Sequence, residues 1–177
     1  MWGLRHRSRY SLFYTRDKPL WAITLKRITV EAEKCAGCRQ CEMVCSFHHT
    51  KTFSPEASRV TVIKEDRLGL DYPLMCRQCS DCPPTEACPA KALTRLEGVI
   101  KVDLQACIGC GVCVEECRYG AVKLHEGKAL ICDLCGGDPR CVARCPTGAL
   151  RYAESPELRE TPREAFERLK KEWGMRG

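Results

Sequence analysis

Sixteen cysteines are the residues of this 177-residue chain whose type and spacing could carry chemistry. At about 9% of the sequence, they far exceed the cysteine content of an ordinary globular protein. They form four groups of four, with none left over: Cys35, Cys38, Cys41 and Cys45; Cys76, Cys79, Cys82 and Cys88; Cys107, Cys110, Cys113 and Cys117; Cys132, Cys135, Cys141 and Cys145. Such grouping indicates metal ligation or covalent cross-linking.

Disulfide cross-linking is one use of so many cysteines, but it requires an oxidising compartment. The N-terminal region has charges and no apolar run of signal-peptide length, and no stretch approaches the roughly 18 apolar residues of a membrane-spanning helix. Cysteines without an export signal favour metal or redox chemistry. We therefore expect a cytoplasmic protein whose cysteines bind metal in a reducing environment.

The spacing of the cysteines distinguishes iron–sulfur clusters from zinc. A tetrahedral zinc site commonly takes two C-x2-C pairs, whereas three of the groups here begin with a C-x2-C-x2-C run that can wrap three corners of a cube. The fourth ligand must then come from elsewhere, as in two-cluster ferredoxins, where the fourth cysteine ligates the other cluster. Pro89 and Pro146 after Cys88 and Cys145 fit that pattern. The sequence therefore predicts four 4Fe–4S clusters.

Short elements must position these ligands. Strand signals flank a glycine turn at residues 92–102 and again at 122–131, and both segments predict β-hairpins. Between the first two groups, residues 59–64 predict a strand and 68–74 a loop. Loop, short helix and strand thus recur along the chain, which is the signature of an internal repeat.

The C-terminal region predicts an amphipathic helix. Thr161 and Glu164 have the spacing of a capping box, with Pro162 at the first helical position. Four apolar residues then fall on one face, and we expect them to pack on the chain's own domain rather than on a partner: Ala165, Phe166, Leu169 and Trp173.

Residues 1–24 are rich in basic and aromatic side chains. A membrane-surface anchor, a partner-docking arm and a poorly ordered extension all remain open for this segment. The formal charge of +6 could indicate an acidic partner such as nucleic acid. Sixteen thiolates on four cationic cores would, however, make the loaded protein slightly negative, so we expect no nucleic-acid partner.

Catalytic motifs do not stand out in the sequence. No Ser/His/Asp, paired-carboxylate or phosphate-loop arrangement is evident, and Gly109-Cys-Gly111 belongs to a ligand loop rather than to a nucleotide fingerprint. His48 and His49 follow the first group, but sixteen cysteines already suffice for four clusters. A surface position or a place beside a cluster is the expectation for both histidines.

The cysteine motifs resemble those of the four-cluster, ferredoxin-like electron-transfer subunits of molybdenum and tungsten oxidoreductases, over about residues 25–152. The run from Cys35 to His49, with Phe53-Ser-Pro and Ser58-Arg-Val, is most similar to the small subunits that accompany tungstopterin aldehyde oxidoreductases. Subunits of tungsten benzoyl-coenzyme A reductases are similar too. The motif that begins at Cys107 and Cys132-Asp-Leu-Cys match the broader group.

This resemblance implies an α+β fold of two dicluster, ferredoxin-like halves in tandem, loop-rich, with short hairpins and helices. Residues 25–152 would form the four-cluster domain, the outer half from groups one and four and the inner half from groups two and three. Residues 1–24 would be an extension and 153–177 a C-terminal helix. The implied ligand sets are crossed: Cys35, Cys38, Cys41 with Cys145; Cys132, Cys135, Cys141 with Cys45; Cys76, Cys79, Cys82 with Cys117; and Cys107, Cys110, Cys113 with Cys88. Cys82 comes two positions earlier than in the family pattern.

The function expected from these features is electron transfer without bond-making chemistry. The chain would relay electrons between a tungsten- or molybdenum-pterin catalytic subunit and a flavin-bearing subunit or ferredoxin, in an anaerobic cytoplasm and without membrane contact. A free-standing polyferredoxin and a subunit of another redox complex remain the alternatives. An exposed apolar patch on the arm, the C-terminal helix or the insertion would favour the subunit.

Overall fold

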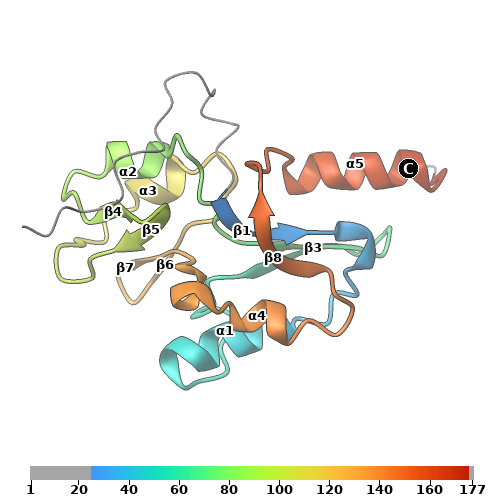
Figure 1. Ribbon diagram of the computed structural model, residues 1–177, viewed down its shortest axis with the longest axis horizontal. Helices are drawn as coiled ribbons and strands as arrows, with labels where there is room; N and C mark the ends of the chain where they lie inside the picture. Colours follow the sequence, from blue (N-terminus) through green and yellow to red (C-terminus); the bar gives the residue numbers. More distant parts are fainter. Residues whose placement is uncertain (1–24, 176–177) are drawn as a thin grey trace, which may run out of the picture.

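The computed structural model describes residues 25–175, which fold into short strands and helices joined by long loops (Figure 1). In chain order the elements are β1 (Leu25–Val30), η2 (Ala32–Lys34), α1 (Gln40–Thr50), β2 (Thr61–Glu65), β3 (Leu70–Leu74), α2 (Pro83–Ala87), β4 (Leu93–Leu96), β5 (Val99–Val102), α3 (Val112–Glu115), β6 (Lys123–His125), β7 (Lys128–Leu130), η3 (Leu134–Gly137), α4 (Arg140–Ala143), β8 (Leu150–Ser155) and α5 (Pro162–Glu172). The mixed helix-and-strand, loop-rich class expected from the sequence is confirmed.

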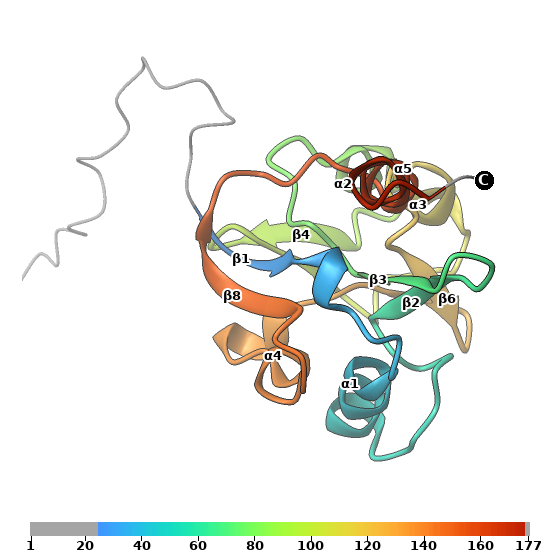
Figure 2. The same ribbon diagram turned by 90° about the vertical axis from the view of Figure 1, so that its right-hand side faces the viewer.

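Two-stranded antiparallel sheets make up all the strand pairing of the described residues. β1 pairs with β8, from Leu25 opposite Ser155 to Val30 opposite Leu150, so the two segments that flank the four cysteine groups in the sequence lie side by side (Figure 2). The remaining sheets are the hairpins β2–β3, β4–β5 and β6–β7. The hairpins predicted at residues 92–102 and 122–131 are therefore confirmed.

The prediction of a loop at residues 68–74 was wrong, because most of that segment is strand β3. Leu70, Tyr72, Pro73 and Leu74 are buried and Asp71 is half-buried, so the strand is covered on both faces over most of its length. Asp71 and Pro73 weakened the strand signal in the sequence, since both residue types are depleted in strands. β3 pairs with β2 and turns the insertion between groups one and two into a hairpin.

Helix contacts sort the cysteine groups into two pairs. α1 of group one packs against α4 of group four, and α2 of group two packs against α3 of group three (Figures 1 and 2). Apolar residues gather in three buried clusters that all contain cysteines. Burial in this small fold is thus concentrated around the thiols rather than in one large apolar core.

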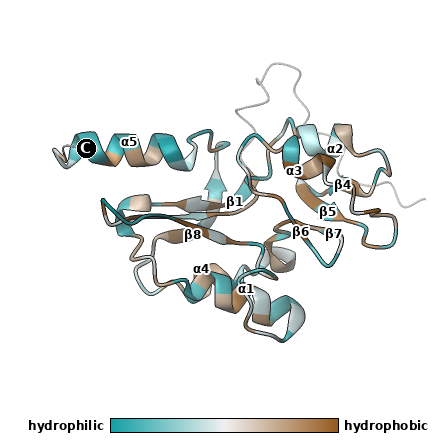
Figure 3. Ribbon diagram, turned by 180° about the vertical axis from the view of Figure 1, so that it is seen from behind, coloured by the Kyte–Doolittle hydropathy of each residue, from teal (hydrophilic) through white to brown (hydrophobic). Residues whose placement is uncertain are grey.

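The capping box predicted for the C-terminal helix is confirmed: Thr161 Oγ1 accepts from the N–H of Glu164, and the Glu164 carboxylate accepts from the N–H of Thr161. Ala165, Phe166 and Leu169 are buried against the β3 region, while most of α5 is hydrophilic in Figure 3. Trp173, expected on the same face, follows the helix and is 51% exposed.

Two further expectations concern the membrane and the N-terminal segment. No helix within residues 25–175 is long and apolar enough to cross a membrane. The extension expected at residues 1–24 lies outside the described residues.

Candidate metal centres

Left-handed backbone shapes the loops that carry the cysteines. In the first loop Gly37 and Arg39 have φ of +59°, and α1 begins directly after them. A side chain at Gly37 would collide with the carboxylate of Asp71. In the third loop Gly109 and Gly111 have φ of +70° and +84°. Glycine adopts this conformation without steric cost, so the turns between successive cysteines can be tight.

Each of three cavities is lined by three cysteines of one group and the last cysteine of another. Their cysteines are Cys35, Cys38, Cys41 with Cys145; Cys76, Cys79, Cys82 with Cys117; and Cys107, Cys110, Cys113 with Cys88. Cys82, the early member of group two, lies with its expected partners. Loops far apart in the sequence thus converge in pairs.

The remaining cysteines form a fourth convergence. Cys45 of α1 shares a buried cluster with Cys132 and Cys141. Burial raises the pKa of Cys132, Cys135 and Cys141, and the nearby Cys45 sulfur raises each further. The sets that the fold brings together are therefore the crossed sets implied by the family resemblance. Ligation by these sixteen residues stays a prediction.

The chemistry of the donor sets fits a soft metal centre. Burial raises the pKa of Cys41 and Cys132 to about 12 and of Cys79 to about 11, from 9.0. At neutral pH these thiols would stay protonated unless a bound cation stabilised the thiolate. Sites built only from thiolates suit iron–sulfur clusters or zinc. The C-x2-C-x2-C runs and the crossed last cysteine select the iron–sulfur cluster.

Backbone N–H groups point at several of the sulfurs. The N–H of Arg59 donates to Cys45 Sγ at 3.3 Å, that of Ala121 to Cys117 Sγ at 3.4 Å, and that of Ala129 to Cys107 Sγ at 3.4 Å. Such bonds stabilise negative charge on a cluster's ligands and are one of the protein's controls over its reduction potential.

Neighbouring sets adjoin one another in a row. Cys76, Cys82 and Cys117 pack against the cluster that holds Cys88, Cys107 and Cys113. Cys132 is close enough to Cys76 to raise the pKa of its thiol, and Cys41 is close enough to Cys141 to do the same. If each set is named after the first cysteine of its C-x2-C run, the row therefore runs from the Cys107 set through the Cys76 set and the Cys132 set to the Cys35 set. Its end sets contain Cys110 and Cys38, the two exposed cysteines.

Group one differs from the others in the backbone after its last cysteine. The chain turns at a left-handed residue three positions after Cys88, Cys117 and Cys145, namely Lys91, Gly120 and Gly148. After Cys45, in contrast, α1 continues to Thr50, with Ser46 at the position of the proline in groups two and four.

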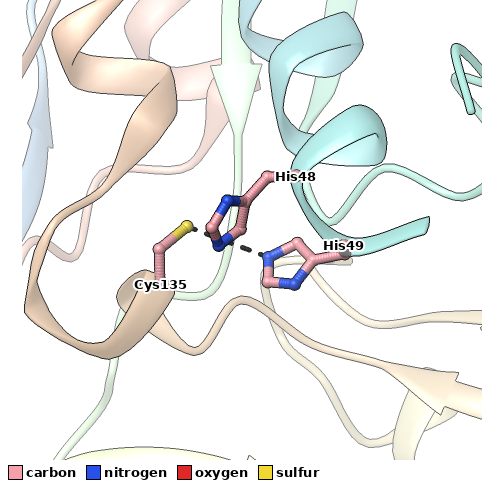
Figure 4. Close-up of side chains that lie close together, drawn as sticks. All are labelled: His48, His49 and Cys135. Carbon is pink, nitrogen blue, oxygen red and sulfur yellow. Dashed lines mark hydrogen bonds between the residues drawn. The ribbon is translucent and has the colours of Figure 1, made fainter. Parts of the chain in front are cut away.

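The continued helix brings two histidines to the fourth group (Figure 4). His49 Nε2 lies 3.8 Å from Cys135 Sγ, and the His48 and His49 rings pack edge to face at a centroid distance of 4.8 Å. Burial, helped by the nearby Arg59, lowers the pKa of His49 to about 4. His49 is thus beside a predicted ligand, one of the two positions left open by the sequence.

Two buried polar residues were missed in the sequence. Glu42 accepts from the N–H of Val62 at 2.6 Å and pairs with Arg39. Gln78, 1% exposed, donates to the carbonyl oxygen of Cys132 and accepts from the N–H of Ile100. Glu42 directly follows the last cysteine of the first C-x2-C-x2-C run, and Gln78 lies between two cysteines of the second run. Their positions next to cysteines could have indicated that both are buried.

Four all-cysteine sets formed by crossed loops define an iron–sulfur protein of the ferredoxin type. Comparison with known proteins gives the family. The 4Fe-4S binding domain family matches residues 100–123. The polyferredoxin-like subunit of an aliphatic sulfonate oxidoreductase from Pyrococcus furiosus is 43% identical, over 67% of this chain and 70% of that protein.

Two further comparisons concern a bacterial relative and a solved structure. The electron transport protein HydN of Escherichia coli K12 is 34% identical, over 75% of this chain and 90% of that protein. A chain of the benzoyl coenzyme A reductase complex BamBC aligns with 26% identity over 88% of this chain and 94% of that chain, with a TM-score of 0.45. The chain belongs to the family of iron–sulfur electron-transfer proteins that includes the polyferredoxin-like subunit and HydN.

Proposed function

We propose that this protein is an electron-transfer subunit that carries four 4Fe–4S clusters in tandem ferredoxin-like halves. The observation that carries the proposal is the convergence of all sixteen cysteines into four sets of four, each completed by the last cysteine of a distant group. The outer half would join groups one and four within residues 25–152, and the inner half groups two and three. Residues 153–177 would add the C-terminal helix, and 1–24 an extension.

The row of cysteine sets suits a relay. When bound, each cluster supplies a one-electron couple, so that single electrons could cross the subunit. The chain's own residues hold the sets in contact, exclude water from the buried thiols and leave Cys38 and Cys110 accessible at opposite ends of the row. These two ends are our candidates for electron exchange with partners. No residue with a catalytic role is needed.

A groove between α1 and α4 supports an obligate partner over a freely diffusing polyferredoxin. Its wall contains Phe47 and Phe53, which stack at a centroid distance of 4.8 Å and are 45% and 65% exposed. Lys51, Arg140 and Arg144 also line it. Aromatic side chains rimmed by charge are typical of protein interfaces. Such a groove fits an acidic surface with an apolar anchor.

The partner that we propose is a tungsten- or molybdenum-pterin catalytic subunit, with a flavin-bearing subunit or ferredoxin at the other end. The motifs from Cys35 to His49 support this choice through their similarity to subunits of aldehyde oxidoreductases. A relative that belongs to a sulfonate oxidoreductase supports a catalytic partner more broadly. A reducing cytoplasm suits both thiolate ligands and oxygen-sensitive clusters.

Anaerobic affinity purification tests the proposal. We expect about sixteen irons per chain, four clusters by quantitative spectroscopy, and a co-purified subunit that contains tungsten or molybdenum. Phe53→Ser should reduce co-purification, whereas Trp173→Ser, which removes an exposed aromatic ring at the end of α5, should not. A monomer with a full iron content and no partner would favour the polyferredoxin, and stoichiometric zinc without iron would overturn the cluster assignment.

A further inference from the structure

The imidazole of His49 is directed at a sulfur of the Cys45, Cys132, Cys135 and Cys141 set. Its Nε2 lies 3.8 Å from Cys135 Sγ, within reach of an N–H···S hydrogen bond, and only 15% of its side chain is exposed (Figure 4). His49 comes from the last turn of α1, 86 residues before Cys135 in the sequence. The contact therefore exists only in the folded chain.

The surroundings of His49 leave the sulfur as its hydrogen-bond partner. Asp133 is the competing acceptor, but its nearest oxygen is 3.7 Å from Nε2, too far for an N–H···O bond. Arg59 Nη1 already pairs with Asp133 Oδ2 at 2.5 Å, and the N–H of Cys135 donates to Oδ1 at 3.1 Å. The His48 ring, packed edge to face on His49, fills the remaining side.

We propose that His49 donates a hydrogen bond to Cys135 Sγ and thereby raises the reduction potential of the cluster held by this set. The inference rests on the proposed function, in which Cys135 is a ligand. A reduced cluster carries more negative charge on its sulfurs than an oxidised one, so a donor stabilises the reduced state more. His49 is a positioning residue, since it acts through Cys135.

The position of His48 gives this effect a functional context. His48 lines the groove of Phe47 and Phe53 between α1 and α4. The pair of imidazoles therefore connects the groove to Cys135, and the cluster that His49 influences lies behind the surface that we assign to the partner. Ligand atoms of His48, His49 and Cys135 all lie within 4.8 Å of one another, so the rival explanation is a separate metal site.

The test is a spectroscopically monitored redox titration of the anaerobically purified full chain. In His49→Leu we expect one of the four cluster potentials to fall by the equivalent of about tenfold in the equilibrium constant, 59 mV for one electron. His49→Gln keeps an N–H donor at a similar reach and should recover most of the shift. His125→Leu, on the separate hairpin β6–β7, should change none of the four potentials.

A double-mutant cycle identifies the cluster. Cys135→Ser marks the component of the titration that belongs to this set, and adding His49→Leu to Cys135→Ser should shift no other component. Unchanged potentials in His49→Leu with all four clusters present would overturn the inference alone. Equal shifts in His49→Leu and His49→Gln would also overturn it, because they would indicate a steric effect.

Two outcomes separate this inference from the proposed function. Wild-type protein without a cluster that responds to Cys135→Ser would overturn the ligand assignment and the role of His49 together. Stoichiometric zinc alongside the clusters, lost in His49→Leu, would assign the histidine pair to a metal site and reject the hydrogen-bond role, while the electron-transfer function would stand.

Discussion

Gln78 Nε2 donates a hydrogen bond of 2.7 Å to the carbonyl oxygen of Cys132, 54 residues further along the chain. Gln78 Oε1 accepts from the N–H of Ile100, also at 2.7 Å. One buried amide thus joins the Cys76 loop to the Cys132 loop and to β5. These loops carry adjacent sets of the row, so Gln78 bonds one set's loop to the other's.

Replacing Gln78 with Leu should destabilise the protein, because two buried backbone groups lose their partners. Each unsatisfied group costs about 1–3 kcal/mol. Anaerobic denaturant unfolding should show that the free energy of unfolding falls by about 1–3 kcal/mol for each of the two groups. The magnetic coupling between the clusters of the Cys76 and Cys132 sets should also weaken. Gln105→Leu is the matched control, since Gln105 is exposed. Equal stability of the two variants would contradict the bridging role.

Cys45→Ser should eliminate or alter the cluster of Cys132, Cys135 and Cys141 rather than that of Cys35, Cys38 and Cys41. Combining Cys45→Ser with Cys132→Ser should then affect one cluster, whereas Cys45→Ser with Cys35→Ser should affect two. Iron content and Mössbauer spectra distinguish these counts. The reverse result, with two clusters lost in the first combination, would reject the crossed assignment.

Gly109→Ala should disrupt the third ligand loop. A Cβ at this position would collide with the carbonyl oxygen of Gly127 in the β6–β7 turn, and the φ of +70° adds strain. Gly120→Ala is the control, because φ is +66° there but no atom lies within 4 Å of the added Cβ. We expect Gly120→Ala to cost about 1–2 kcal/mol and Gly109→Ala to cost more and to lower iron occupancy. Equal losses of stability in the two variants would show that the backbone at Gly127 can move to accommodate the added Cβ.

Removal of iron should unfold much of the chain. Eight of the cysteines are buried, and the three buried apolar clusters of the fold are all built around cysteines rather than around a separate apolar core. Binding energy of the metal therefore becomes folding energy. An anaerobic chelator should abolish most far-UV circular dichroism, and re-addition of iron and sulfide should restore it. A spectrum unchanged by complete iron removal would contradict this dependence.

Local signals in the sequence predicted the parts of this fold that depend on neighbouring residues. The capping box of Thr161 and the glycine turns at Gly98 and Gly127 each act within a few positions. Strand β3 was not predicted because Pro73 and Asp71 are residue types that are rare in strands. Its strand conformation depends on burial against other elements, which the local sequence does not show. Gln78 was missed for a similar reason, and the partner of His49 could not be named from the sequence, since the residues that they contact lie 54 and 86 positions away.

The crossed grouping of the cysteines was a different kind of prediction. It came from the resemblance to a family, because the spacing within each group does not say which group supplies a fourth ligand. The pairing of β1 with β8 gives the physical basis for one crossing, since it holds together the segments before the first cysteine group and after the last, and brings Cys35 near Cys145.

Ser46 allows α1 to continue past Cys45. Its Oγ donates to the carbonyl oxygen of Met43 at 3.0 Å and accepts from the N–H of Ser54 at 3.2 Å. Ser46→Pro would place proline inside the helix, where it removes a hydrogen bond, clashes with the preceding turn and costs about 3 kcal/mol. We expect α1 to be disrupted near Cys45 and His49 to be displaced from Cys135.

Ser46→Pro should therefore lower the potential of the same cluster as His49→Leu, and adding His49→Leu should produce little further change. Ser46→Ala is the control, because it removes the hydroxyl and its two bonds but keeps the helix, so the potential should stay at the wild-type value. A wild-type potential in Ser46→Pro, with a shifted one in His49→Leu, would show that the histidine reaches Cys135 without the continued helix. The serine in place of a proline would then be unrelated to the properties of this cluster.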